Sequence, residues 1–310
     1  MGLRKDVARI KHIARYREIA NVFIKHGFGF LFDRVSLAKI MGRWKAGGWG
    51  NYAQDFGNPQ RLRYALEELG PTFVKLGQLL SIRPDLLNPD YIKELEKLQD
   101  EVPPVAYDEV LKVCQQGGLN IERDFRSVNP VPLAAASIAQ VHEAVLNSGE
   151  NVVLKVQRPG IEKIIDIDLL ILADLGGLLE RHTAWGRLYK ASEIVAELAG
   201  AIRKELDFAL EAHNADIFRS HYQGDFSVLI PKVYWEYSSP KVLTMESLIG
   251  IKVSDLAGLK KANLNSTQVA KNLLAALFSQ IFEYGFFHAD PHPGNIAINA
   301  AGQIIFYDFG

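Results

Sequence analysis

The C-terminal segment FHADPHPGNIAINAAGQIIFYDFG carries three polar side chains at spacings that suit phosphate chemistry. Asp290 precedes Asn295 by five residues, and Asn295 precedes Asp308 by thirteen. Oxygen ligands such as those of Asn295 and Asp308 suit Mg²⁺, while Asp290 could accept or orient the proton of an attacking hydroxyl. A hairpin between Asn295 and Asp308 would return the aspartate to the asparagine. The segment therefore predicts a site that holds Mg-nucleotide for phosphoryl transfer.

A lysine within an apolar strand pattern is the second candidate. Lys155 lies in the run VVLKV, and a predicted helix downstream places three polar side chains on one face at i, i+4 and i+7: Asp207, Glu211 and Asn214. We expect Glu211 to pair with Lys155 and to direct its ammonium toward the nucleotide phosphates. A solvated surface lysine would gain little from such a pair.

The histidines near Asp290 allow a different interpretation. His288, Asp290 and His292 could form a transition-metal site of a hydrolase, because imidazole and carboxylate groups bind such metals. That interpretation leaves Asn295 and Asp308 without a role. We therefore interpret His292 as a loop residue that hydrogen-bonds to the backbone.

The elements that must position these residues follow from periodicity and turn signals. The pattern over residues 60–118 predicts helices, with Asn88 as the N-cap of one of them. The patterns further down the chain predict a hairpin over 137–156, helices over 161–179 and 192–218, strands over 228–233 and 242–245, a long helix over 266–287 and a second hairpin over 296–306. This order indicates an α+β fold with two lobes. We divide the chain into a basic segment and linker (1–58), a helical extension (59–129), an N-lobe with inserted helices (130–248) and the start of a C-lobe (249–310).

Composition and charge indicate the surroundings in which the protein is expected to lie. The 310-residue chain has a net charge of −1, yet residues 1–45 hold eleven Lys/Arg against three Asp/Glu, an excess of eight positive charges. A partly apolar stripe runs through these cations, at Val7, Ile10, Ile13, Ala14, Arg17, Ala20, Asn21 and Ile24. The pattern fits either an interfacial helix on an anionic membrane or an ordinary solvated helix.

The single cysteine, Cys114, fits a reducing compartment and a buried position. We expect no secretory signal and no transmembrane helix.

Several motifs together resemble the UbiB/ADCK (AarF-domain) family of atypical protein-kinase-like proteins, over roughly residues 60–310. They are GPTFVKLGQLLSIRPDLL with its KxGQ motif, PLAAASIAQVH, VVLKVQRPG, ELDF, the positions Glu211 and Asn214, the HAD loop and DFG. The resemblance implies a two-lobed protein-kinase-like fold with an N-terminal helical extension. Because such a fold continues beyond the DFG motif, we interpret the chain as truncated in its C-lobe.

The resemblance also assigns roles to residues that spacing alone would not select. It implies that Lys75 of the KxGQ helix, with Gln78 beside it, folds over the cleft and meets Glu205 and Asp207. An alanine-rich loop, Ala134, Ala135, Ala136 and Ser137, takes the place of a glycine-rich phosphate loop, and alanine would restrict backbone approach to phosphate. The hinge is expected at Met245 to Leu248, where the segment that includes Glu246 and Leu248 would offer backbone groups to adenine.

The expected function is an atypical kinase or ATPase that binds ATP or ADP with Mg²⁺. By resemblance it supports isoprenoid-quinone or prenyl-lipid biosynthesis, from a peripheral position on the cytoplasmic face of the membrane, with quinone-biosynthesis proteins or prenyl-lipid intermediates as partners and no nucleic acid. Two alternatives remain: a small-molecule phosphotransferase, against which the KLGQ motif and the alanine loop argue, and a nucleotide-sensing scaffold without phosphoryl transfer.

Overall fold

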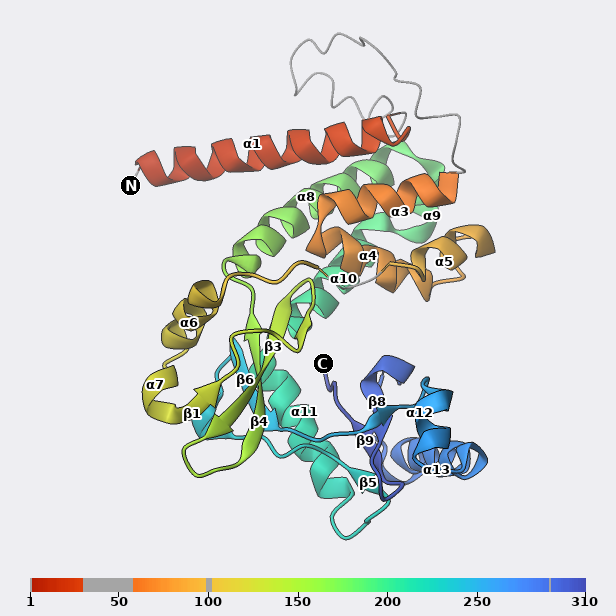
Figure 1. Cartoon of the computed structure of the whole chain (residues 1–310). Coiled ribbons are helices and arrows are strands. Elements are labelled where there is room, and N and C mark those ends of the chain that lie inside the picture. The colour runs from red at the N-terminus through yellow and green to blue at the C-terminus, as the bar shows by residue number, and fades with distance from the viewer. Residues whose placement is uncertain (1, 30–57, 99–101, 290) are drawn as a thin grey trace. The chain divides into compact units, whose positions relative to one another are not determined.

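A computed structural model describes residues 2–29, 58–98, 102–289 and 291–310 of the chain (Figure 1). Two compact units emerge from its contacts. The helical unit consists of Met1–Val102, Ala136–Ile138 and Gly160–Arg203, and the sheet unit consists of Pro103–Ala135, Ala139–Pro159 and Lys204–Gly310. The combination of helices with one antiparallel sheet and one mixed sheet, in which only β5 and β9 pair in parallel among the described strands, confirms the predicted α+β class. The four sequence segments proposed above stay a prediction.

The helical unit is built from helices that pack side by side. Their bounds are α1 Gly2–Lys25, α3 Asn58–Leu69, α4 Pro71–Ser81, α5 Pro89–Leu95, α8 Ile161–His182, α9 Ala184–Tyr189 and α10 Ala191–Glu205, the last of which runs on into the sheet unit. Asn88 caps α5 as predicted, because its side-chain oxygen accepts from the backbone N–H of Tyr91 at 3.2 Å. Within the described residues, no helix is both long and apolar enough to cross a membrane.

Close packing in this unit explains the glycine of the KLGQ motif. Gly77 lies on α4, where α3 and the segment after α5 approach it. A Cβ atom at this position would lie 2.2 Å from Leu98 Cδ1 and 2.8 Å from Leu66 Cδ1. Any larger residue would push these helices apart. The glycine is therefore required by packing, apart from any role of its neighbours Lys75 and Gln78.

A buried ion pair attaches α1 to the rest of the helical unit. The Arg15 guanidinium donates to both carboxylate oxygens of Asp168 on α8, at 2.7 and 2.9 Å, and also to the carbonyl oxygen of Leu69 at 2.7 Å. Thr72 donates its hydroxyl to the same carboxylate at 2.8 Å, and the Asp168 side chain is fully buried. Removing one partner would leave a buried charge without compensation, so the pair fixes how α1 lies on α3 and α8 (Figure 1).

The first sheet of the sheet unit contains the predicted hairpin. Its strands are β1 Phe125–Val128, β2 Ala134–Ala135, β3 Ala139–Leu146, β4 Asn151–Gln157 and β6 Val242–Glu246, in the order β1-β3-β4-β6 with β2 paired to β3. Two helices precede it, α6 Tyr107–Gln116 and α7 Ile121–Asp124. One face of the sheet packs against α6 in a core that includes Val110, Cys114, Leu146, Leu154 and Val156.

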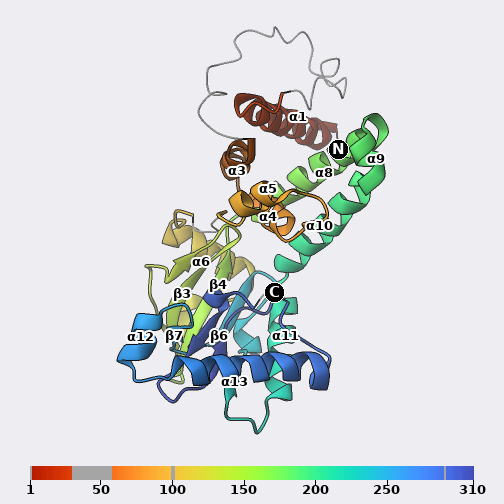
Figure 2. The same cartoon turned by 90° about the vertical axis from the view of Figure 1, so that its right-hand side faces the viewer.

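The second sheet carries the C-terminal hairpin. It consists of β5 Val228–Leu229, β7 Ile251–Lys252, β8 Ile296–Ile298 and β9 Ile304–Phe306, in the order β5-β9-β8-β7. The accompanying helices are α11 Phe208–His221, α12 Leu256–Lys261 and α13 Ser266–Ser279, with short 3-10 helices at Trp235–Tyr237 and Pro293–Asn295. A continuous core joins α11 and α13 to this sheet, and Figure 2 shows the end of α11 reaching α13.

Two helices predicted as continuous are interrupted. The prediction over 192–218 is wrong at Leu206 and Asp207, where α10 ends and α11 begins, because the Asp207 side chain accepts from the backbone N–H groups of Ala209 and Leu210 and starts a new helix. The prediction over 266–287 is wrong at its end. There α13 gives way to a π-helical turn, Gln280–Tyr284, and Gly285 ends that turn at a φ of 64°.

Candidate active site

The predicted ion pair between Lys155 and Glu211 is present in the sheet unit. Successive residues of β4 face opposite sides of the sheet, so burial of Leu154 and Val156 in the α6 core leaves Lys155 on the side of α11. The Lys155 ammonium donates to both carboxylate oxygens of Glu211, at 2.7 Å each. It also lies 5.2 Å from the centroid of the Phe208 ring. With only 4% of the Glu211 side chain exposed, this is a buried pair held in a fixed geometry.

Helix α11 uses each of its three predicted polar residues differently. Asp207 is the N-cap, Glu211 binds Lys155, and the Asn214 side-chain amide donates to the backbone carbonyl of Phe309 at 2.8 Å. Spacing predicted that they share a face, but gave no role to Asn214. Its contact attaches α11 to the residue that follows Asp308.

Asp308 reaches the same place by way of the C-terminal hairpin. Pairing of Ile296 with Phe306 across β8 and β9 sets the register, and the backbone N–H of Tyr307 donates to the carbonyl of Asn295 at 3.0 Å. Asn295 and Asp308 are thereby brought to one end of the hairpin, as the sequence predicted. The Asp308 carboxylate lies 3.8 Å from the Lys155 ammonium and remains 46% exposed.

The electrostatics of this cluster favour a cation. Burial raises the pKa of the Glu211 carboxyl to about 7, the Lys155 ammonium opposes that rise, and the Asp308 carboxylate adds to it. For Lys155, burial opposes the charged form, but the carboxylates of Asp308, Glu211 and Glu205 outweigh it and raise the lysine pKa. One ammonium therefore faces several carboxylates. A cation beside the exposed Asp308 oxygens would relieve their mutual repulsion, and oxygen donors suit Mg²⁺.

Comparisons with known proteins show the family to which the chain belongs. The family model described as the ABC1 atypical kinase-like domain matches residues 97–310. The chain belongs to the ABC1 atypical kinase-like family. The predicted resemblance and the kinase-like fold are thus confirmed.

Three relatives place the chain within this family. An uncharacterised protein from Synechocystis is 44% identical over 269 residues, covering 84% of this chain and 46% of that protein. A probable protein kinase UbiB from Marinobacter nauticus is 42% identical, with 81% and 47% covered. The solved complex of Rv3197 with erythromycin, from Mycobacterium tuberculosis, matches with a TM-score of 0.58 at 29% identity and covers 79% of this chain and 61% of that one. The chain spans about half the length of the two sequence relatives.

Of the remaining site residues of this ABC1-family protein, Glu205 acts electrostatically on Lys155, while Lys75, Gln78 and Asp207 have other positions in the structure. Lys75 and Gln78 lie on α4 of the helical unit, where the Gln78 amide donates to the carbonyl of Leu98 at 3.4 Å. Glu205 and Asp207 belong to the sheet unit. That Lys75 meets these carboxylates stays a prediction, and Asp290 lies outside the described residues.

The alanine-rich loop of the ABC1-family chain crosses from one unit to the other. Ala134 and Ala135 form β2, which pairs with Val141 and Gln140 of β3. Ala136 and Ser137 group with the helical unit, and the Ser137 side chain is buried. The role of these four residues in phosphate binding therefore remains a prediction.

The expected hinge has its own backbone partners. The N–H groups of Glu246 and Ser247 donate to the carbonyls of Lys232 and Asn151, and the Leu248 carbonyl accepts from the Tyr307 hydroxyl. Contact with adenine stays a prediction for this segment.

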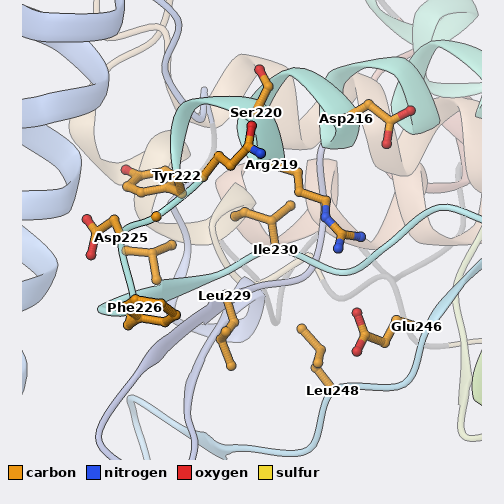
Figure 3. A pocket seen from close by; sticks show the side chains of 13 residues that line it. Asp216, Arg219, Ser220, Tyr222, Asp225, Phe226, Leu229, Ile230, Glu246 and Leu248 are labelled. Carbon is orange, nitrogen blue, oxygen red and sulfur yellow. The ribbon is translucent and has the colours of Figure 1, made fainter.

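The side chains of Glu246 and Leu248 line a separate pocket of about 640 Å³ (Figure 3). The end of α11 and β5 complete its walls, and the Arg219 guanidinium extends toward the side of the pocket where Glu246 lies. Lys155, Glu211 and Asp308 do not line it. The pocket is therefore distinct from the ion-pair cluster.

The loop role expected for His292 is confirmed, whereas the alternative metal site of His288, Asp290 and His292 is not tested, because Asp290 lies outside the described residues. His292 Nδ1 accepts from the backbone N–H of Gly294 at 3.1 Å, which confirms the loop role expected for this residue. The His288 ring lies among Phe218, Phe306 and Phe309, with centroids 5.7 to 6.1 Å away. No group of three or more His, Cys, Asp or Glu side chains that could hold a metal occurs among the residues that the structure describes.

Proposed function

We propose that this protein binds Mg-ATP in the sheet unit and turns it over as an atypical kinase or ATPase. The observation that carries the proposal is the buried Lys155–Glu211 pair beside the exposed Asp308 carboxylate. A lysine fixed by a helix carboxylate next to a metal-binding aspartate is the arrangement by which kinases hold the phosphates of ATP. Membership of the ABC1 family supports the same conclusion.

Each residue of the cluster has a distinct task in this proposal. Glu211 holds the Lys155 ammonium in place, so that the ammonium can bind α- and β-phosphate oxygens without first losing rotamer freedom. Asp308 and Asn295 would hold Mg²⁺, which neutralises charge on the phosphates. From the sequence, Asp290 would orient the attacking hydroxyl or water.

The test compares nucleotide binding with and without Mg²⁺ in the parent and three variants. Asp308→Asn removes a charged ligand, so we expect Mg²⁺ to strengthen ATP binding in the parent but hardly in this variant. Asp108→Asn, an exposed position in the first turn of α6, is the matched control and should behave like the parent. Asp290→Asn should bind Mg-ATP normally and release phosphate at least roughly tenfold more slowly, because a base acts only along the reaction coordinate.

Each outcome bears on one part of the proposal. Equal Mg²⁺ dependence in the parent and Asp308→Asn would refute the metal site. Mg-dependent binding without any phosphate release in the parent would replace turnover with the nucleotide-sensing scaffold.

The wider role is proposed from the family. We infer that the activity supports isoprenoid-quinone or prenyl-lipid biosynthesis at a membrane surface, because a relative of 42% identity carries the name UbiB and the sequence motifs match that family. Partners would then be proteins or prenyl-lipid intermediates of that biosynthesis. The exposed face of α1 is the surface on which we propose membrane contact.

A further inference from the structure

A buried glutamine lies in the π-helical turn after α13. Gln280 is fully buried and uses both ends of its side-chain amide. Its Nε2 donates to the Tyr222 hydroxyl at 3.2 Å, and its Oε1 accepts from the backbone N–H of His288 at 3.0 Å. Tyr222 in turn donates to the carbonyl of Ala276 at 3.0 Å. The side chain therefore joins the end of α11, the end of α13 and the segment that leads to Asp290.

The surroundings of this amide are otherwise apolar and aromatic. Phe218 packs against Phe286, with ring centroids 5.0 Å apart, and against the His288 ring at 6.1 Å. An amide buried in such a place costs free energy unless its hydrogen bonds are satisfied, and an apolar residue of similar size would avoid that cost. Packing alone therefore does not explain a glutamine here. The glutamine differs from an apolar residue in that its side-chain oxygen accepts a hydrogen bond from the backbone N–H of His288.

The backbone around Gln280 suits this task. A π-helical turn is rare and changes the direction in which the following side chains point. Gly285, at a φ of 64°, then reverses the chain, so that His288 comes back to Gln280 eight residues after it. The contact closes the loop between α13 and the HAD segment. The His288 end of this loop is also held by its ring, which packs among the aromatic rings of Phe218, Phe306 and Phe309.

We propose that Gln280 is a positioning residue that fixes the backbone of His288, from which the chain continues to Asp290. This inference rests on the proposed function, since Asp290 follows His288 by two residues and is its expected catalytic aspartate. Gln280 lies in the core and acts through the backbone. Its loss should therefore change turnover while nucleotide binding at Lys155 and Asp308 persists.

The experiment compares three substitutions. Gln280→Met keeps the approximate volume but accepts no hydrogen bond from His288. Gln280→Glu keeps an oxygen for the His288 N–H, and in its protonated form also a donor for Tyr222. Gln268→Met alters an exposed glutamine of the preceding helix α13, whose side-chain amide contacts only the Asn272 side chain among the hydrogen bonds described for it, and is the matched control.

Two measurements are made on folded protein, well below the unfolding temperature of every variant. The first is ATP turnover at saturating Mg-ATP together with the dissociation constant for Mg-ATP. We expect Gln280→Met to lose roughly 10- to 100-fold in kcat with less than about a threefold change in affinity, because a small misplacement of a catalytic group costs this much. Gln280→Glu should recover most of the kcat, and Gln268→Met should match the parent.

The second measurement is hydrogen exchange at the His288 amide, which needs no activity. Gln280→Met should exchange this amide at least about tenfold faster than the parent, whereas Gln280→Glu should not. Unchanged protection in Gln280→Met would overturn the proposed contact. Faster exchange with an unchanged kcat would reduce Gln280 to a purely structural residue. Failure of the parent to bind Mg-ATP would instead refute the proposed function, and the exchange result would then decide the contact by itself.

Discussion

At the scale of single residues, the site depends on what surrounds the Asp308 carboxylate. Lys155 and Glu211 lie on one side of it, while Asn214 holds the next carbonyl, that of Phe309, at 2.8 Å. Groups that orient a metal ligand influence metal affinity almost as much as the ligand itself. Asn214 thus links the helix of the ion pair to the metal-binding end of the hairpin.

Substitutions at Asn214 should weaken Mg²⁺ binding with little change in the fold. Asn214→Leu and Asn214→Asp both remove the N–H that donates to Phe309, so each should raise the Mg²⁺ concentration needed for half-maximal ATP binding by roughly tenfold. Titration of ATP binding with Mg²⁺ measures this directly. The two variants differ in charge, so weaker Mg²⁺ binding in only one of them would assign the effect to charge. Unchanged Mg²⁺ binding in both would show that Asn214 has no role at the metal site.

At the scale of elements, α1 shows two faces with different environments. Ile19 and Val22 are buried in the helical unit, and Arg15 reaches Asp168. The apolar stripe predicted from sequence is only partly right, because its Ala20 is buried while Ile13 and Arg17 are exposed. The C-terminal half of α1 is therefore neither a fully solvated helix nor wholly available to lipid.

Substitutions on the exposed face of α1 test its contact with a membrane. Deleting the helix would also strip Ile19 and Val22 from the core, so Ile13→Gln with Arg17→Gln is the sharper change. With about 1 kcal/mol for a cation near an anionic surface, plus the lost apolar contact, co-sedimentation with phosphatidylserine vesicles at low salt should weaken roughly tenfold. Asn21→Gln, exposed on the same helix, is the control. Equal binding of all three proteins would refute this surface as the lipid site.

At the scale of the molecule, the single cysteine of the sequence can be used to measure opening of the sheet unit. Cys114 is fully buried on α6, and burial raises the pKa of its thiol from 9.0 to about 12. Since the thiol stays protonated in the folded protein, it contributes stability that is present below about pH 9 and is lost as pH rises toward 12. We therefore expect that labelling of Cys114 at neutral pH requires the unit to open.

Nucleotide should slow the labelling of Cys114 if it binds the sheet unit. At a Mg-ATP concentration of about 100 times the dissociation constant, mass action predicts labelling roughly 100-fold slower than without nucleotide. A thiol reagent that absorbs on reaction measures the rate, and Asp308→Asn, which should lose the protection, serves as the control. Labelling that is equally slow with and without nucleotide, in a protein shown to bind it, would mean that Cys114 reacts through local motion of α6 rather than through opening of the unit.

The sequence by itself determined features that depend on neighbours along the chain. The apolar strand pattern singled out Lys155, turn residues between Asn295 and Asp308 predicted a hairpin, and Asn88 marked the start of α5. Each of these follows from local backbone geometry, which a short stretch of sequence specifies.

Only the tertiary structure decided what long-range packing controls. It gave Asn214 the carbonyl of Phe309, turned one face of α1 inward and joined Gln280 to His288. In each case the two partners are separated in sequence by a turn or by a longer stretch of chain. The outcome depends on which surfaces become buried together, and no local pattern encodes that.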